Sequence, residues 1–524
     1  AAEQRILTHA ARHDGRTVPD TAVDLALLET AANGVQLNAG QIALVQAMAS
    51  SAARVQLAVA PAGAGKTTAM QALARAWTNS GGTVIGLAPS AVAAAGIAEQ
   101  IGAHADTIAK LAWHLTHGNP PAWMNQIGPN TLVVIDEAGM ADTLSLDAVI
   151  NHVIEAGGSV RLIGDDQQLS AIGAGGVLRD IQGTHGVLHL SELVRFAEPA
   201  EGSASLALRE GQPEALGFYL DRDRIHIGTP DTMLDQLFEH WADDRATGLD
   251  SVMLAPTRDL VSQLNQRARD HRLGGTLPDA EVDLADGNRA SAGDVIITRR
   301  TNRKHALNAT DWVKNGDRWT VQAITAGGIH ARHTRSGRHV WLPPDYVAES
   351  VELGYASTTH TAQGITADTM HGLLAGTETR QQAYTMLTRG RRTNTCYLTV
   401  TGDGDLHTLI HPEVVHPATA VDQLERILAR DESPLSATTT LRQASDPAQL
   451  LGDASVRYAD AIVFAADHTT SPADRHTIQV AVDRLLPGLT KADAWPALFA
   501  QLLSINADHR NPIDALTRAA AEPI

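Results

Sequence analysis

The segment APAGAGKT, residues 60–67, joins small residues to a lysine and a threonine. It follows the apolar run VQLAVA (55–60) and precedes TAMQALARAW, which has helical spacing. In such a strand–loop–helix, small residues let backbone N–H groups wrap a phosphate at the helix N-terminus. We expect Lys66 to reach the β- and γ-phosphates of ATP and Thr67 to hold Mg²⁺. The predicted nucleotide-binding residues are Ala60, Pro61, Ala62, Gly63, Ala64, Gly65, Lys66, Thr67 and Thr68, with Ala60 standing where the pattern has glycine.

A second apolar run, TLVVID (131–136), ends in the carboxylate Asp136, and a second carboxylate, Glu137, follows directly. If this run is a parallel strand, Asp136 and Glu137 lie at the carboxyl edge of a sheet, where α/β proteins bind ligands. Asp136 would orient the Mg²⁺, and Glu137 would polarise the attacking water. Strands that end in Asp-Glu are common, so an ordinary strand end is the alternative. The position about 70 residues after the P-loop, with a strand between, favours catalysis.

Three further residues are typical of phosphoryl transfer. Gln168 lies in GDDQQL (164–169) after another apolar run, and its amide can donate to a γ-phosphate and accept from water. Arg195 and Arg389 could stabilise charge on the γ-phosphate, and one arginine from each α/β domain would make hydrolysis depend on closure of the cleft. The alternatives are an ordinary turn at Gln168 and surface salt bridges at the two arginines.

Apolar runs alternate with helical spacing in two regions of the chain. Four runs, at 55–60, 83–88, 131–136 and 159–164, predict parallel strands joined by crossover helices. Apolar runs of the same kind occur again at 251–257 and 395–400. Between these two runs, short β-like segments alternate with turn signals and predict a small antiparallel barrel inserted into the second α/β domain.

These patterns predict an α/β protein with two P-loop-type α/β domains, a β-barrel insert and helical ends. The expected segments are a helical N-terminal segment (1–36), the first α/β domain (37–200), the start of the second (201–285), the insert (286–345), the remainder of the second domain (346–404) and a helical accessory segment (405–524).

Charge is distributed unevenly along the chain. The net charge of −18 argues against a protein that coats nucleic acid through charge alone. Residues 287–345, however, hold ten positive and four negative side chains. They form either a solvated charged face or a surface for phosphate backbones, to which Arg299, Arg300 and Arg303 would contribute. The tryptophans of the insert either stack on bases or fill the barrel core; they are Trp312, Trp319 and Trp341.

Composition excludes several classes of protein. The single cysteine, Cys396, excludes an internal disulfide framework and a zinc site built on several thiolates, and it favours a reduced, cytoplasmic setting. No apolar stretch is long enough to insert into a membrane, and the N-terminus lacks a signal-peptide core. Because the chain does not begin with Met, we expect it to be part of a longer polypeptide.

The segments, in this order, resemble those of superfamily 1 helicases, and more specifically the type B branch that contains RecD-like enzymes, over about residues 37–400. In this branch the two domains are RecA-like (1A, with motifs Q to IV, and 2A, with motifs V and VI) and the insert is SH3-like (2B). The resemblance implies ATP-driven 5′→3′ movement on single-stranded DNA and a role for Gln41 in binding adenine. The motifs are LNAGQ (Q), APAGAGKT (I), LAPSAVAA (Ia), VVIDEAGM (II), GDDQQL (III), LVRF (IV), GYASTTHTAQGITAD (V) and YTMLTRGR (VI).

Within this branch the amino-acid sequence is most similar to the helicase portion of conjugative relaxase–helicases of the MobF type. The resemblance implies the motor of plasmid DNA transfer, with a relaxase domain of the full-length polypeptide and the conjugative transfer machinery as partners. A RecD-like repair helicase and a catalytically silent domain that grips single-stranded DNA are the alternatives. The DNA contacts that it implies are Pro89, Ser90, Thr107, Thr358, Thr359, His360 and Gln363.

Overall fold

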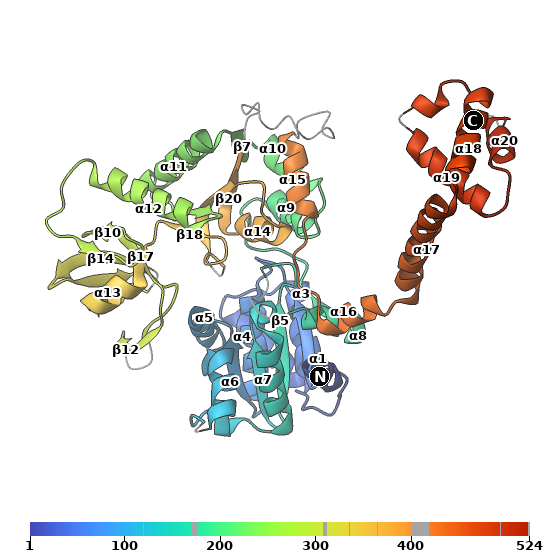
Figure 1. Ribbon diagram of the computed structural model, residues 1–524. Helices are drawn as coiled ribbons and strands as arrows, with labels where there is room; N and C mark the ends of the chain where they lie inside the picture. Colours follow the sequence, from blue (N-terminus) through green and yellow to red (C-terminus); the bar gives the residue numbers. More distant parts are fainter. Residues whose placement is uncertain are drawn as a thin grey trace. The chain divides into compact units, whose positions relative to one another are not determined.

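The computed structural model describes residues 1–118, 120–169, 175–307, 312–334, 336–363, 365–400, 419–492 and 494–521. The chain divides into two compact units, residues 1–436 and 437–524. The first unit contains two parallel sheets and an antiparallel insert (Figure 1). The helical accessory segment expected from residue 405 begins outside the described residues.

The first α/β domain is built on a six-stranded sheet in the order β3-β2-β4-β5-β1-β6. All its pairings are parallel, which confirms the four strands expected from the apolar runs. Its central strands are buried along their whole length, as continuous apolar runs in a covered sheet must be. The strands are β1 (Val55–Val59), β2 (Thr83–Ala88), β3 (Ala105–Thr107), β4 (Thr131–Ile135), β5 (Ser159–Gly164) and β6 (Leu188–His189).

Helices cover both faces of this sheet. One apolar cluster joins it to α2 (Asp20–Ala32), α3 (Ala39–Ser50), α4 (Lys66–Asn79) and α5 (Ala91–Ile101). The other cluster joins it to α1 (Ala2–Ala10), α6 (Ile108–His117), α7 (Thr143–Glu155) and α8 (Val177–His185). Because α1 and α2 fill these two cores, residues 1–36 are part of the first domain and not a separate segment.

The second α/β domain has a five-stranded parallel sheet in the order β18-β8-β19-β20-β7. One side packs on α9 (Pro199–Arg209), α10 (Ala215–Asp221), α14 (Arg380–Met386) and α15 (Ala420–Ala429), and the other on α11 (Pro230–Ala246) and α12 (Arg258–Leu273). Helix α15 therefore belongs to this domain, and the unit boundary falls after residue 436 and not near 405. The strands are β7 (Ile225–Gly228), β8 (Ser251–Ala255), β18 (Ala356–Thr358), β19 (Ala367–Leu374) and β20 (Gly390–Thr399).

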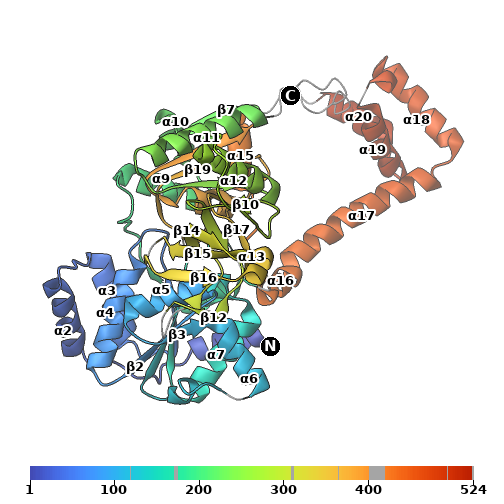
Figure 2. The same cartoon turned by 90° about the vertical axis from the view of Figure 1, so that its left-hand side faces the viewer.

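The insert is antiparallel, as its turn signals predict, and Figure 2 shows its strands β14, β15 and β16. It extends past the expected end at residue 345, because β17 (Val351–Leu353) pairs with β11 (Val295–Thr298). Trp319 is fully buried in its core, whereas Trp341 is half exposed. The other elements are β9 (Val282–Asp283), β10 (Arg289–Ala290), β12 (Asn302–Ala306), β13 (Trp312–Val313), β14 (Arg318–Thr325), β15 (Gly328–His333), β16 (His339–Leu342) and α13 (Pro344–Ser350).

The second unit is helical in its described part. Its core contains Ala466, Ile478, Val482, Leu502 and Leu503. No helix among the described residues has the length and apolarity that a membrane crossing requires. The helices are α16 (Ala437–Ala444), α17 (Pro447–Thr469), α18 (Pro472–Leu485), α19 (Trp495–Ala507) and α20 (Pro512–Ala521).

A buried arginine secures the helix that precedes the P-loop. Arg161 on β5 is fully buried and donates to the carbonyls of Met48, Ser51 and Ala53, at the end of α3 and just after it, at 2.9–3.1 Å. Burial lowers the pKa of its guanidinium to about 10. The carbonyl groups left over at the end of α3 are thereby satisfied without a carboxylate.

Replacing this arginine tests its structural role. Arg161→Met keeps the apolar stem but leaves three buried carbonyls without donors, and we expect it to lower the free energy of unfolding by about 2–4 kcal/mol. Urea unfolding followed by circular dichroism measures this. Arg12→Ala, which removes an exposed pair with Asp14, is the control and should change stability by less than about 1 kcal/mol. Equal effects of the two substitutions would contradict the assignment.

Candidate nucleotide site

The P-loop has the backbone shape that phosphate binding requires. It follows β1, where the Ala60 N–H donates to the Gly164 carbonyl (2.9 Å), and it ends at Lys66, the first residue of α4. Gly63 and Gly65 have φ values of 89° and 72°, in the left-handed region that favours glycine. A Cβ on Gly63 would lie 2.7 Å from the Cβ of Arg195. The loop is therefore closely covered, and larger residues would not fit.

Lys66 meets both carboxylates of the acidic pair. Its Nζ lies 3.0 Å from Glu137 Oε1 and 3.8 Å from Asp136 Oδ1. Burial alone would lower the pKa of Lys66, but the charges of Glu137 and Asp136 raise it above its ordinary value. Glu137 has φ 51°, in the left-handed region, which is unusual for a residue with a side chain. The P-loop lysine and the acidic pair thus form one charged cluster.

Gln168 is held against a neighbouring carboxylate. Its Nε2 donates to Asp165 Oδ2 (3.3 Å), and both side chains are buried. Asp165 also accepts from Arg209 Nε of α9 (2.9 Å), while Arg209 Nη2 donates to Asp166 (2.6 Å). The polar segment that ends β5 is therefore tied to α9 by two ion pairs.

The two predicted arginines converge on the same cluster. Arg195 donates to the Thr388 carbonyl (3.0 Å), and the buried Arg389 donates from Nε to the Thr385 carbonyl (2.7 Å). Burial, and then the nearby charge of Arg195, lower the pKa of Arg389 to about 10. Burial would raise the pKa of Glu137, but Lys66 above all, and then Arg389 and Arg195, lower it. The positive charge around Glu137 keeps this carboxylate ionised.

Gln41 contacts the P-loop, although both ends of its amide are engaged within the protein. Its Oε1 accepts from the Asn38 N–H (2.9 Å), and its Nε2 donates to the carbonyls of Gly65 (3.2 Å) and Ala64 (3.4 Å). Gln41, on α3, therefore stabilises the end of the P-loop through hydrogen bonds to its backbone. Its expected contact with adenine stays a prediction.

Two residues that sequence reasoning did not single out belong to the site. Tyr384, from the motif around Arg389, contacts both the P-loop and Asp165, and Arg209 pairs with Asp165 and Asp166. The position of Tyr384 within its motif was the one available signal. Nothing in the local sequence distinguishes Arg209 from other helix-surface arginines.

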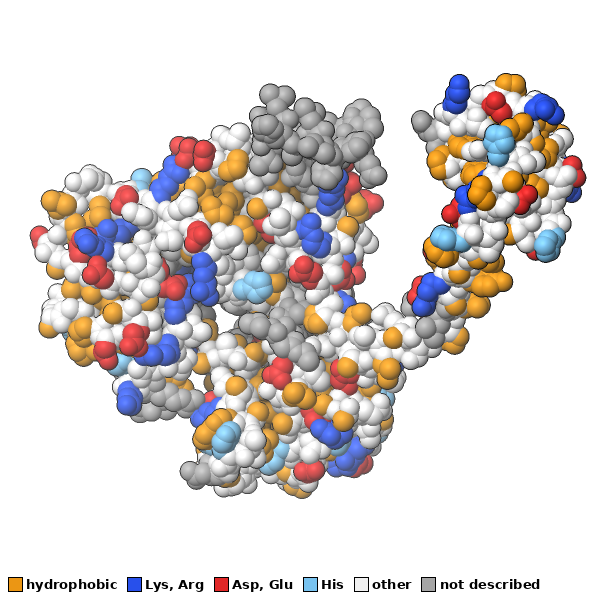
Figure 3. All heavy atoms as spheres, viewed as in Figure 1, with side chains coloured by type: hydrophobic (Ala, Val, Ile, Leu, Met, Phe, Trp, Pro, Cys, Tyr) orange, Lys and Arg blue, Asp and Glu red, His pale blue; other side chains and the backbone are white. Residues whose placement is uncertain are grey.

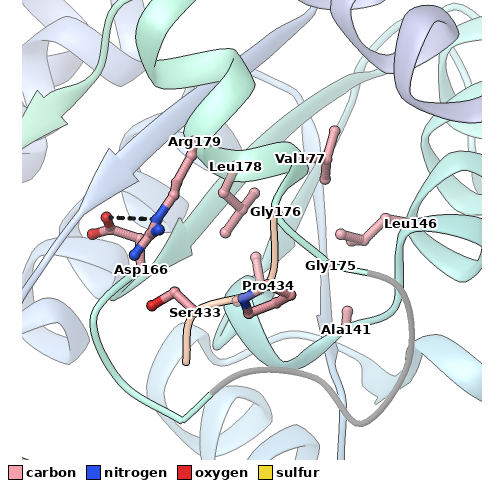
Figure 4. Close-up of a pocket in the computed structure, with 12 residues that line it drawn as sticks. Ala141, Leu146, Asp166, Gly175, Gly176, Val177, Leu178, Arg179, Ser433 and Pro434 are labelled. Carbon is pink, nitrogen blue, oxygen red and sulfur yellow. Dashed lines mark ion pairs between the residues drawn. The ribbon is translucent and has the colours of Figure 1, made fainter. Parts of the chain in front are cut away.

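A small cavity lies beside this polar segment. Figure 4 shows Asp166 paired with Arg179 of α8, at 3.8 Å, and Ser433 and Pro434 close to Gly175 and Gly176. The segment after α15 in the second domain thus returns to the first domain and covers this cavity. Its wall also includes Ala138, Gly139, Ala141, Leu146, Val177 and Leu178.

The side chains expected to touch DNA have differing environments. The hydroxyls of Ser90 and Thr107 cap α5 and α6 by accepting from backbone N–H groups. Thr358 shares a hydrogen bond with Thr361 (2.9 Å). Both amide atoms of Gln363 are buried and lack a hydrogen-bond partner within the described part of the chain. Of the rest, Pro89 is partly buried, His360 is exposed and Thr359 is buried.

The arginines of the insert are largely neutralised by acidic neighbours. Arg299 pairs with Glu352 (2.5 Å) and Arg300 with Glu349 (3.2 Å); the side chain of Arg303 lies outside the described part. Over the whole insert, 281–353, the sequence has ten positive and nine negative side chains. Charges of both signs intermix over this region at the left of Figure 3. The positive balance therefore falls from +6 in residues 287–345 to +1 when the insert is bounded by its observed strands.

The residues present fit a magnesium–nucleotide complex. The P-loop forms a glycine-lined cradle, Lys66 lies partly buried beside it, and the exposed Thr67 lies in the first turn of α4. Thr67 and Asp136 would hold Mg²⁺, which supplies positive charge to the phosphate oxygens when bound. Lys66, Arg195 and Arg389 would add fixed positive charge to the same phosphates.

Comparisons with known proteins find a family model, two related sequences and a solved structure that are similar to this chain. A family model described as an AAA domain matches residues 36–230. The conjugal transfer protein TraA of Rhizobium radiobacter is 29% identical over 74% of this chain and 34% of that protein. The probable conjugal transfer protein TraA of Sinorhizobium fredii is 30% identical over 65% of this chain and 31% of that protein. The chain spans about a third of the length of these curated relatives.

The Pif1 helicase from Bacteroides, solved with ADP-AlF3 and ssDNA, superimposes with a TM-score of 0.48 at 17% identity, over 70% of this chain and 93% of that chain.

The chain has two parallel sheets, and the P-loop and its acidic pair lie at the edge of the first one. This arrangement is that of a P-loop nucleotide-binding protein of the RecA-like helicase fold. The TraA proteins are similar to this chain over 65–74% of its length. Its ordered motifs resemble those of the RecD-like branch of the superfamily 1B helicases.

The P-loop lysine provides the first test of the site. We expect Lys66→Ala to lower ATP hydrolysis at least about 100-fold, because it removes the fixed charge nearest the phosphates. Binding of single-stranded DNA should largely survive, since no expected DNA contact involves Lys66. A colorimetric phosphate assay and fluorescence anisotropy with a labelled oligonucleotide measure the two quantities. Parallel loss of both would contradict the role assigned to Lys66.

Arg389 provides the second test. Arg389→Ala should lower ATP turnover by about 10³-fold or more, with little loss of ATP affinity, because an arginine finger acts mainly on the transition state. Arg391→Ala is a matched control, since Arg391 is exposed and pairs with Asp368 (2.8 Å). Steady-state kinetics should separate the two variants, and unchanged turnover in Arg389→Ala would remove this residue from the site.

Proposed function

We propose that this chain is an ATP-driven DNA translocase and helicase that moves 5′→3′ along single-stranded DNA. The observation that carries the proposal is the convergence of Lys66 and Glu137, from the first sheet, with Arg389, from the second domain. Such a site is complete only when both domains contribute. Binding and loss of a triphosphate would therefore change the fit between the domains, as a motor requires.

Each residue has a distinct part in the proposed hydrolysis. Glu137, ionised by its positive neighbours, orients and polarises the attacking water. Gln168, held by Asp165, senses the γ-phosphate. Lys66, Arg195 and Arg389 stabilise the charge that develops on the transferred phosphoryl group.

The DNA would lie across the carboxyl edges of both sheets. Ser90 follows β2, Thr107 ends β3 and Thr358 ends β18, so their polar groups are at the same kind of edge in each domain. Contacts from hydroxyl and amide groups position a strand without reading its sequence. Since Arg299 and Arg300 already pair with glutamates, we expect the insert to supply less of the electrostatic grip than its arginine count suggests.

We propose conjugative DNA transfer as the cellular role, with the chain as the motor part of a relaxase–helicase. The TraA relatives support this role, and a relaxase domain of the full-length polypeptide and the transfer machinery would be the partners. The complete set of Lys66, Asp136, Glu137 and Arg389 argues against a silent domain that only binds DNA.

Strand displacement tests direction. With ATP and Mg²⁺, a duplex with a 5′ single-stranded tail should be unwound at least about tenfold faster than the same duplex with a 3′ tail, because 5′→3′ movement from a tail reaches the duplex only in the first case. A fluorescence-quenching assay measures the rates, and Lys66→Ala is the control for ATP-driven unwinding. Faster unwinding of the 3′-tailed duplex would overturn the proposed polarity.

A further inference from the structure

A tyrosine hydroxyl joins three separate parts of the site. Tyr384 lies on α14 of the second domain, and its side chain is almost completely buried. Its hydroxyl donates to Asp165 Oδ2 (2.9 Å) and accepts from the Ala62 N–H (3.1 Å). One atom of the second domain thus contacts both the P-loop and the polar segment that ends β5.

Asp165 connects this hydroxyl to the predicted γ-phosphate sensor. The Oδ2 atom that accepts from Tyr384 also accepts from Gln168 Nε2 (3.3 Å). The other oxygen, Oδ1, accepts from Arg209 Nε (2.9 Å) and from the Gln167 N–H (3.2 Å). Since the carboxylate side chain is fully buried, these four donors, which are those found among the described residues, set its orientation.

Ala62 connects the same hydroxyl to the phosphate cradle. Its N–H stands at the start of the loop, immediately before Gly63. Its methyl group belongs to the apolar cluster of the second domain, which also contains Leu208 and Tyr384. The beginning of the P-loop is therefore held by the second domain through one hydrogen bond and one apolar contact.

We infer that Tyr384 is a positioning residue, whose hydroxyl fixes the P-loop and Gln168 in one arrangement across the two domains. This inference rests on the proposed function of the site. Tyr384 acts through Ala62 and Asp165 and does not touch the phosphates itself. Its part is to make the placement of Gln168 depend on how α14 sits against the first domain.

The chemistry of the hydroxyl agrees with this role. Burial raises the pKa of Tyr384 well above its ordinary value, so the group keeps its proton at neutral pH and can donate and accept at once. Phenylalanine would keep the packing of the ring and remove only the two hydrogen bonds. The buried Ala62 N–H would then lack an acceptor, and Asp165 would lose one of its donors.

Tyr384→Phe in the full chain tests the inference. We expect kcat for DNA-stimulated ATP hydrolysis to fall about tenfold or more, since one buried hydrogen bond to a charged group is worth about that factor in a rate. The KM for ATP should change by less than about threefold, because Lys66 and the glycines of the loop remain. This split between kcat and KM distinguishes positioning from a role in nucleotide binding.

Tyr219→Phe is the matched control. Tyr219 is fully buried in the same apolar cluster, but its hydroxyl has no hydrogen-bond partner among the described residues. We expect wild-type kinetics from this variant. Thermal unfolding of both variants checks that the fold persists, and ATP hydrolysis without DNA gives a second rate if either variant loses stability.

The possible results separate the two proposals. A kcat for Tyr384→Phe within twofold of wild type, or a similar loss in Tyr219→Phe, would overturn the inference. An increased KM with unchanged kcat would also overturn it, because Tyr384 would then serve nucleotide binding alone. Failure of the wild-type chain to hydrolyse ATP faster with DNA would instead count against the proposed function.

Discussion

The site depends on the burial of one positive charge between two negative ones. A lysine removed from water is tolerated only when carboxylates or phosphates face it, and Lys66 has Glu137 and Asp136 at 3.0 and 3.8 Å. This pairing joins the P-loop after β1 to the end of β4, and the charge of Lys66 lowers the pKa of Glu137 at the carboxyl edge of the sheet. The parallel sheet supplies the geometry, because all its strands present their last residues to the same edge.

The second domain completes the site by contributing groups to the first. Arg389 is buried in the second domain beside Arg195, while Tyr384 and Arg209 hold Asp165. The hydrogen bonds that Tyr384 and Arg209 donate to Asp165 are charge-assisted, and such bonds are strong and directional. A network of this kind has few alternative arrangements. Small changes in the positions of groups around the phosphates would consequently shift α14 and α9, which lie far along the sequence from the P-loop.

The sequence predicted the features that have a local origin. Buried parallel strands require continuous apolar runs, and phosphate loops require glycine at left-handed positions, so β1, β4 and the P-loop followed from short segments. Contacts between distant residues left no such pattern. Arg299 meets Glu352, and Tyr384 meets Asp165, through the way strands and helices assemble, which periodicity does not encode. For the same reason the insert was predicted to end at 345, before β17, whose partner β11 lies about 50 residues earlier.

The central claim is that nucleotide hydrolysis at this two-domain site is coupled to a single strand of DNA. The most direct measurement is the initial rate of ATP hydrolysis by the purified chain with Mg²⁺, with and without a single-stranded oligonucleotide long enough to cross both domains. We expect a rate at least about tenfold higher with the oligonucleotide, because DNA bound to both domains favours the arrangement in which the site is complete. The same rate in both conditions would contradict it.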